Sequence, residues 1–335
     1  MSADLTTRYL GFQLRNPLIA SSCPLTAEID VLRRLEAVGA AAAVLPSLFE
    51  EQLLDAPAAA PKGHAFCTDE FGKSLNYFHE MGHYNRGPDR YLHQLAEAKK
   101  AVSIPIIASL NGTSEGGWVQ YAKRIQEAGA DALEMNIYSV VPDPEVTAEQ
   151  VESRYVELVA AVRDEITIPL AVKVSPFFTA FANVAHRLTV AGADGLTLFN
   201  RFLQPDVNIH TLKVCPHLVL SNADEMRLPL RWMAILRGQT SASLAATGGI
   251  HTAESAIKML LAGADSVMIC SALYRNGIEY MGTMLADLTR WLDESDFHSI
   301  EQLKGHLSQK KCPDPTIFER ANYTKAVTSF ANDSV

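Results

Sequence analysis

Two adjacent glycines at the end of an apolar stretch are the clearest chemical feature of this sequence. They stand in Thr247-Gly248-Gly249, directly before a segment with the pattern of a helix. Glycine has no Cβ, so successive backbone N–H groups can approach a phosphate closely, and a helix N-terminus adds positive potential. A second apolar stretch ends in Cys270-Ser271 and brings a hydroxyl. We predict that these five residues form a phosphate site; the alternative is a tight turn without a ligand.

Lys173 lies inside another apolar stretch, Ala171-Val172-Lys173-Val174. A buried ammonium group is costly unless it meets an anion or hydrogen-bond acceptors. A flavin ring that gains negative charge on reduction would be such a partner. Lys173 is therefore a candidate for flavin contact and for catalysis; the alternative is a lysine whose charged tip reaches solvent at the strand end.

Asn136 and Asn200 each end a further apolar stretch. An amide offers both donors and acceptors, which suits a planar heterocycle. Asparagine is common at strand ends, so neither residue is informative alone. Together with Lys173 and the glycine pair, however, they would share one ligand if the four strand ends met.

A loose internal repeat predicts that the strand ends do meet. A helix-like segment repeatedly ends in Ala-Gly-Ala-Asp or a near variant, and a short apolar strand follows at once. The glycine suits the left-handed position after a helix, and continuous apolar strands are typical of a parallel sheet covered on both faces. We expect a (β/α)8 barrel, the alternative being an open doubly wound sheet. The predicted strands are residues 17–21, 41–45, 106–109, 132–137, 170–174, 195–199, 243–247 and 266–270.

Helices are predicted between these strands, and two connections are longer than plain turns. The long connections are residues 46–88 and 200–228, and the second is expected to include a small strand at 218–220. Both leave the C-terminal ends of strands, where barrel enzymes build active sites. We expect one domain over residues 1–335, with a helical extension over about 278–335. The other predicted helices are residues 28–38, 89–102, 116–128, 148–165, 180–191, 228–236 and 252–262.

The composition narrows the class of protein. The formal net charge is −9 and the basic residues are scattered, which argues against nucleic acid as a partner and favours a small-molecule substrate. The sequence has neither a signal-peptide pattern nor an apolar run of ~18 residues, so we expect a cytoplasmic protein without a membrane segment. Five cysteines without a C-x-x-C pair predict thiols rather than a zinc or iron–sulfur site, and the scattered histidines predict no metal.

Five segments, in order and at similar spacing, resemble the soluble, class 1-like dihydroorotate dehydrogenases of pyrimidine biosynthesis. The resemblance runs from about Leu10 to Gly277. It implies an FMN-binding barrel that oxidises dihydroorotate to orotate. The segments are NPLIASS (16–22), EMNIYS (134–139), VKVSPFF (172–178), TGGI (247–250) and CSALYRNG (270–277).

The resemblance also implies roles for single residues. Ser139 matches the position of the general base that takes a proton from dihydroorotate while hydride passes to the flavin. Serine is a weak base near neutral pH, so it would need a desolvated pocket or a relaying water; the alternative is an ordinary loop serine. Flavin contacts are implied for Ser21, Ser22, Ser47, Asn136, Lys173 and Asn200, phosphate contacts for Thr247, Gly248, Gly249, Cys270 and Ser271, and substrate contacts for Met81, Gly82, Asn85, Asn136 and Asn200.

Departures from the family pattern concern the substrate. Pro46 stands where the family usually has a lysine, His79 replaces an asparagine, and Val140-Val141 replace Pro-Asn. Asn200 is followed by Arg201 rather than serine. The histidine and arginine side chains could meet an anionic substrate by another geometry, the alternative being exposed loop residues.

Several functions remain open at this stage. The leading one is an FMN-dependent dehydrogenase acting on CH–CH bonds, with dihydroorotate as the default substrate. The alternatives are an FMN barrel acting on another pyrimidine-like or enone substrate, a flavin-binding, non-catalytic partner of an electron-transfer complex, and a phosphate-binding lyase or isomerase with Lys173 as a Schiff base. The resemblance implies a homodimer and leaves an electron-transfer partner open. The lack of an iron–sulfur motif and of an N-terminal membrane helix argues against the quinone-linked class.

Overall fold

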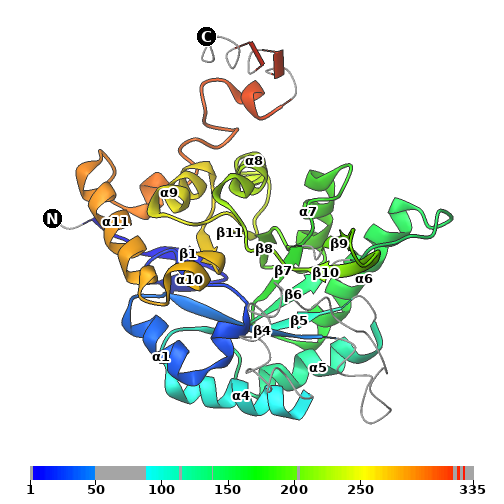
Figure 1. The fold of residues 1–335 in the computed structure, drawn as a ribbon. Helices are drawn as coiled ribbons and strands as arrows, with labels where there is room; N and C mark the ends of the chain where they lie inside the picture. The colour runs from blue at the N-terminus through cyan, green and yellow to red at the C-terminus, as the bar shows by residue number, and fades with distance from the viewer. Residues whose placement is uncertain are drawn as a thin grey trace.

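Eight parallel strands close into a barrel in the order β11-β12-β3-β4-β5-β6-β7-β8 (Figure 1). The computed structural model describes residues 3–49, 88–112, 115–137, 139–201, 204–319, 323–324 and 327–328. The closed barrel confirms the expected fold class and rules out the open sheet. The strands are β3 (Leu18–Ala20), β4 (Ala42–Phe49), β5 (Ile106–Asn111), β6 (Ala132–Ile137), β7 (Leu170–Val174), β8 (Gly195–Leu198), β11 (Ser243–Thr247) and β12 (Ser266–Ile269).

Helices surround the barrel and alternate with its strands (Figure 1). Their apolar sides pack on the outward face of the strands in one large buried cluster. A second cluster fills the barrel interior with smaller side chains such as Ala132, Ala171 and Ala245. The helices are α1 (Ile29–Ala37), α4 (Pro88–Ala101), α5 (Glu115–Glu127), α6 (Ala148–Glu165), α7 (Phe181–Val190), α8 (Arg227–Leu236), α9 (Ala253–Ala262), α10 (Ser271–Asn276), α11 (Tyr280–Glu294) and α12 (Ile300–Leu303).

A short hairpin closes the end of the barrel where the strands begin. It consists of β1 (Thr7–Tyr9) and β2 (Phe12–Leu14). Thr7 Oγ1 donates to Asp265 O at 2.8 Å, and Leu10 N donates to Ser243 Oγ at 3.1 Å. Lys304 Nζ, just after α12, also reaches Asp265 Oδ1 at 2.9 Å. This end is therefore sealed, and the opposite end is left for a ligand.

Strand β4 runs to Phe49, four residues beyond its predicted end at Leu45. Its register against β5 shifts between Val44 and Ser47. Pro46 lies in this shift, where it cannot donate a backbone hydrogen bond to the ladder. The irregularity lets the strand continue past the proline, so Ser47 lies within β4 rather than in a loop.

The connection after β8 corrects the prediction of a strand at residues 218–220. It forms a hairpin of β9 (Gln204–Asn208) and β10 (Lys213–His217), and residues 218–220 are not a strand. An apolar triplet becomes a strand only when it finds a pairing partner, and here β10 pairs with β9 directly before it. The hairpin also corrects a second prediction, since Cys215 in β10 is disulfide-bonded. Cysteine spacing alone does not reveal which cysteines a fold brings together.

Among the described residues, no helix is both long and apolar enough to cross a membrane.

Candidate active site

A cavity of about 1250 Å³ opens where the barrel strands end. Residues at or just after the ends of all eight barrel strands line it. Every residue predicted to hold the cofactor is part of this lining. These residues are Ser21, Ser22, Ser47, Asn136, Lys173, Asn200, Thr247, Gly248, Gly249, Cys270 and Ser271.

The two glycines after β11 differ in what surrounds them. Both have positive φ, 88° at Gly248 and 73° at Gly249. A Cβ on Gly248 would meet nothing within 4 Å, whereas a Cβ on Gly249 would lie 2.3 Å from Met226 N. Gly248 therefore faces open cavity, and Gly249 allows the segment before α8 to pack against the turn. Ser271 Oγ, on the other side of the turn, accepts a hydrogen bond from Ser221 N at 3.1 Å.

Lys173 is buried at the cavity wall and pairs with an acidic residue inside the barrel. Its Nζ lies 3.5 Å from Glu134 Oε1, and Thr197 Oγ1 donates to Glu134 Oε2 at 3.0 Å. Glu134 is completely buried. The anion that the sequence required for Lys173 is thus supplied by the protein itself. Sequence reasoning missed Glu134, although it lies two residues before Asn136 and so faces the same side of β6.

Only the nitrogen of the Asn136 side-chain amide has hydrogen-bond partners. Its Nδ2 donates to Ser47 Oγ at 2.8 Å and to Ser109 Oγ at 2.9 Å. Its Oδ1 is buried and has no hydrogen-bond partner among the described residues, and the same holds for Asn200 Nδ2. A buried acceptor or donor left unpaired costs about 1–3 kcal/mol. One acceptor and one donor are therefore available to a polar ligand in the cavity.

Asn111 and Ser109 were not predicted as site residues. Asn111 is the last residue of β5 and lines the cavity, and Ser109 supports Asn136 from the same strand. The predicted strand stopped at Ser109, two residues before the observed end of β5 at Asn111. Polar residues ending a parallel strand were the signal that found Asn136, and the same signal points to Asn111.

Ser139 lies just beyond β6, against helix α6. Its backbone N donates to Tyr155 Oη at 2.8 Å, and the two hydroxyl oxygens lie 2.9 Å apart. Tyr155 is buried and its ring packs edge-on against Phe178. Ser139 is not among the described residues that line the cavity.

Comparison with known proteins fits this arrangement. Residues 4–292 match the family model described as dihydroorotate dehydrogenase. The chain belongs to the dihydroorotate dehydrogenase family. It is therefore an oxidoreductase of a family that acts on a CH–CH bond.

Relatives in this family are similar over most of their length. The Thermoplasma acidophilum protein named dihydroorotate dehydrogenase B (NAD(+)), catalytic subunit, is 26% identical, and the match covers 90% of this chain and 98% of the relative. Proteins of the same name from Listeria monocytogenes and Bacillus cereus are both 27% identical. These matches cover 67% and 69% of this chain and 75% and 76% of the relatives.

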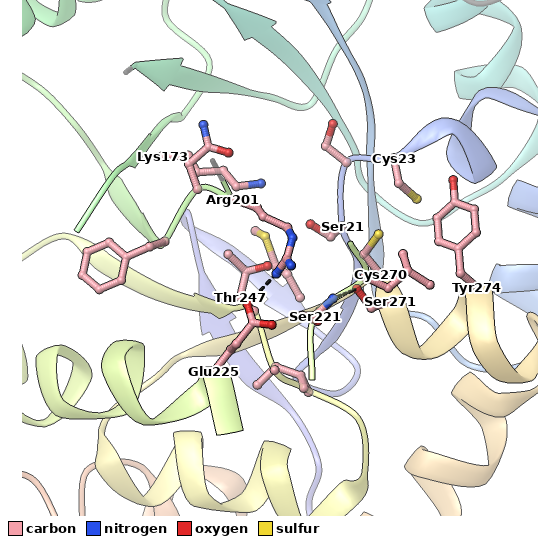
Figure 2. Close-up of a pocket in the computed structure, with 18 of the residues that line it drawn as sticks. Ser21, Cys23, Lys173, Arg201, Ser221, Glu225, Thr247, Cys270, Ser271 and Tyr274 are labelled. Atoms are coloured by element: carbon pink, nitrogen blue, oxygen red, sulfur yellow. Dashed lines mark hydrogen bonds and ion pairs between the residues drawn. The ribbon is translucent and has the colours of Figure 1, made fainter. Parts of the chain in front are cut away.

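Arg201, which differs from the usual residue of the dihydroorotate dehydrogenase family, lines the cavity. It lies between Lys173 and Thr247 in the view of Figure 2, and its Nη1 pairs with Glu225 Oε2 at 2.5 Å. Both side chains are more than one-third exposed, so this ion pair is accessible to solvent. A cationic side chain thus enters the cavity next to Asn200, where the family usually has serine.

The other departures lie away from the cavity or outside the described residues. Val140 and Val141 are exposed and do not belong to the described lining. Met81, Gly82 and Asn85, predicted to contact substrate, lie outside the described residues, as does His79. Within the part of the chain that the structure describes, no three His, Cys, Asp or Glu side chains gather as a metal site would require.

Proposed function

We propose that this protein is an FMN-dependent dehydrogenase that transfers hydride between FMN and a CH–CH bond of a small planar substrate, by default dihydroorotate. The observation that carries the proposal is the pairing of two features in one cavity. One is the turn at Gly248, which has room for an anion. The other is the group formed by the unpaired amide atoms of Asn136 and Asn200 and the buried Lys173. Bound FMN would supply a two-electron acceptor for hydride.

The residues present fit both the phosphate and the ring of this cofactor. The open face of Gly248, the Thr247 hydroxyl and the Ser271 hydroxyl would hold the phosphate. Asn136 Oδ1 would accept and Asn200 Nδ2 would donate a hydrogen bond to the ring or to the substrate. Each such bond removes the cost of a buried unpaired group, which gives a physical reason for ligand affinity.

Lys173 would stabilise negative charge that develops in the cavity. Its ammonium group is already oriented by Glu134, so little reorganisation is needed when the charge appears. Burial in a low-dielectric wall strengthens such an interaction over its value in water. Lys173 would therefore favour the reduced, anionic state of the ligand.

Ser139 is our candidate for the group that exchanges a proton with the substrate. The contact with Tyr155 gives its hydroxyl a second hydroxyl with which to exchange a proton. Ser139 is outside the described lining of the cavity, so its contact with a substrate is part of the proposal. Its role as base stays a prediction.

Arg201 favours one second candidate, a different planar substrate of the pyrimidine or enone type. The guanidinium group in the wall can pair with a carboxylate or a carbonyl oxygen from a direction that a serine cannot provide. The chemistry of hydride transfer would be the same. Only the substrate would differ.

We also propose that the chain works in an assembly. Relatives are named catalytic subunits, and the hairpin of β9 and β10 exposes the paired residues Val207 and Val214. An electron-transfer subunit would reoxidise the cofactor, and a homodimer of the barrel is the expected core. Light scattering of the purified chain, alone and with candidate partners, tests this part.

A spectrum tests the proposed function. The full chain, purified gently and then incubated with FMN, should show the visible absorbance of oxidised flavin, and anaerobic dihydroorotate should bleach it. Lys173→Met should bleach far more slowly, whereas the matched surface variant Lys258→Met should behave as wild type. A protein that takes up no flavin would refute the proposal. Flavin that bleaches only with another planar substrate would support the second candidate.

A further inference from the structure

Cys23 and Cys270 bring two thiols together in the cavity wall (Figure 2). They come from neighbouring strand ends, because β12 pairs with β3 with Ile269 opposite Ala20. Ser21 N donates to Ile269 O at 2.9 Å, which holds the two strand ends together just before the cysteines. Both cysteines are free, and each affects the pKa of the other.

The two sulfurs are electrostatically different. Interaction with the Cys270 side chain lowers the pKa of the Cys23 thiol against the opposing effect of burial, and Lys173 lowers it further. The same interaction, together with burial, raises the pKa of Cys270. Because the thiolate is the reactive form of cysteine, we expect Cys23 to act as the nucleophile of the pair and Cys270 as its neutral partner.

We propose that Cys23 and Cys270 are an oxidisable thiol pair that hydroperoxides convert to a disulfide in the cavity wall. The position supports this reading. Both cysteines line the cavity, where a small oxidant can reach them, and the pairing of β12 with β3 holds the two chain segments next to each other. Neither residue has a role in the hydride or proton transfer proposed above.

The reaction proceeds in two balanced steps. The Cys23 thiolate attacks one peroxide oxygen, so an S–O bond forms and the O–O bond breaks, and the other oxygen takes a proton and leaves as water or an alcohol. The Cys270 sulfur then attacks the sulfenic sulfur, so an S–S bond forms, the S–O bond breaks, and water leaves with the Cys270 proton. The hydroperoxide gains two electrons, and the two thiols lose them.

Oxidation should also alter the phosphate side of the cavity. Cys270 directly precedes Ser271, whose hydroxyl accepts a hydrogen bond from Ser221 N. A disulfide that draws Cys270 toward Cys23 would displace this hydroxyl. We therefore expect the disulfide form to bind FMN more weakly. That consequence rests on the proposed function, whereas the oxidation itself does not.

Peptide mass spectrometry of the full chain tests the pair. Protein as purified receives one equivalent of hydrogen peroxide, the remaining thiols are alkylated, and each cysteine peptide is quantified. We expect a peptide that links Cys23 to Cys270 and separates on addition of dithiothreitol. Cys312 is the internal control, since its thiol lies outside the cavity lining and contacts Gln309 O. The free thiols of Cys23 and Cys270 should disappear about tenfold faster than that of Cys312.

Two variants assign the roles of the sulfurs. In Cys270→Ser, dimedone should trap a sulfenic acid at Cys23, whereas in Cys23→Ser the same dose should give no adduct at Cys270. The proposal fails if wild-type Cys23 and Cys270 stay alkylatable, or if they oxidise no faster than Cys312. The wild-type measurement decides the matter even if a variant does not fold. If the disulfide forms in protein that never binds FMN, this inference stands and the proposed function is refuted. If protein loaded with FMN forms no disulfide, this inference is refuted and the proposed function stands.

Discussion

Lys173 Nζ and Glu134 Oε1 lie 3.5 Å apart inside the barrel, in a buried pair that joins β7 to β6. Lys173 is opposite Asn136 in the strand register, and Glu134 is opposite Ala171. Glu134 is therefore one inward-facing layer deeper than Lys173. A ligand in the cavity approaches the lysine from the other side, so a charge that develops on the ligand competes with Glu134 for one ammonium group.

Replacing Glu134 by glutamine should make this competition measurable. The uncompensated lysine should lower the free energy of unfolding by about 3 kcal/mol. In protein loaded with FMN, the redox equilibrium should move toward reduced flavin by about tenfold, which is about 30 mV for a two-electron couple. Urea unfolding and a reductive titration against a reference dye measure the two effects.

Surface and double variants serve as controls for Glu134→Gln. Glu165→Gln, at the exposed pair with Lys123, should change stability by less than about 0.5 kcal/mol. Lys173→Met combined with Glu134→Gln should recover stability, because neither charge is then buried alone. An unchanged potential in Glu134→Gln would show that Glu134 does not set the charge that the flavin meets.

Lys173→Met alone should slow the reaction. Loss of one preorganised positive group in a buried site typically lowers kcat by about 10² to 10³. FMN content should fall less than kcat, since the phosphate turn remains. Steady-state kinetics with dihydroorotate, and flavin quantified after extraction, give the comparison. A loss of flavin with unchanged turnover per flavin would contradict a role in the chemical step.

The two glycines should respond differently to alanine. Gly248→Ala adds a Cβ into open space at positive φ, and its strain should cost about 1–2 kcal/mol of stability. Gly249→Ala places a Cβ 2.3 Å from Met226 N, so the backbone must move and the loss should be larger. Thermal unfolding of the two variants measures the difference. Equal losses of stability in the two variants would mean that the backbone around Met226 can move to accommodate the Cβ of Gly249→Ala at little cost.

Ser139→Ala should leave flavin binding intact and lower kcat by about 10² to 10⁴, the usual range for a general base. Ser139→Cys should retain most of the activity, since a thiol is the more effective proton acceptor of the two. Tyr155→Phe removes the hydroxyl that contacts Ser139 and should lower kcat less than Ser139→Ala. Full activity in Ser139→Ala would remove Ser139 from the mechanism.

His251 should give the fold a pH dependence. Burial lowers the pKa of His251, Arg275 lowers it further, and its Nε2 lies 3.2 Å from Ser221 Oγ. The unfolded chain then binds the proton more readily than the folded one. The contribution of His251 is present in full above the unfolded pKa of about 6.5 and is lost as the pH falls from there through the folded pKa. Urea unfolding of wild type and His251→Gln at several pH values should show a smaller slope below that pH in the variant.

The exposed His186 provides the matched control for this measurement. His186→Gln should keep the wild-type slope. A slope in His251→Gln that equals that of wild type would assign the pH dependence to other groups.

Sequence reasoning located most of the barrel because its signals are local. Residues 148–165 and 170–174 were predicted with their observed bounds, since the patterns that indicate this helix and the strand after Ile-Pro are local in the sequence. The hairpin β9–β10 was missed because its strands, QPDVN and KVCPH, lack the continuous apolar run by which the barrel strands were recognised. The same limit applies to the site. Strand-end positions predicted which residues line the cavity, but the pairs Lys173–Glu134 and Ser139–Tyr155 exist only once neighbouring elements pack.

The affinity for FMN compared with riboflavin tests the central claim most directly, because the two differ only by the phosphate. Quenching of flavin fluorescence by the apoprotein gives both dissociation constants for wild type and for Gly248→Ala. We predict that wild type binds FMN about a hundredfold more tightly than riboflavin, as one or two charge-assisted hydrogen bonds would give, and that Gly248→Ala loses most of this difference. Equal affinities of wild type for the two flavins, or binding of neither, would contradict a phosphate site at Thr247, Gly248 and Gly249.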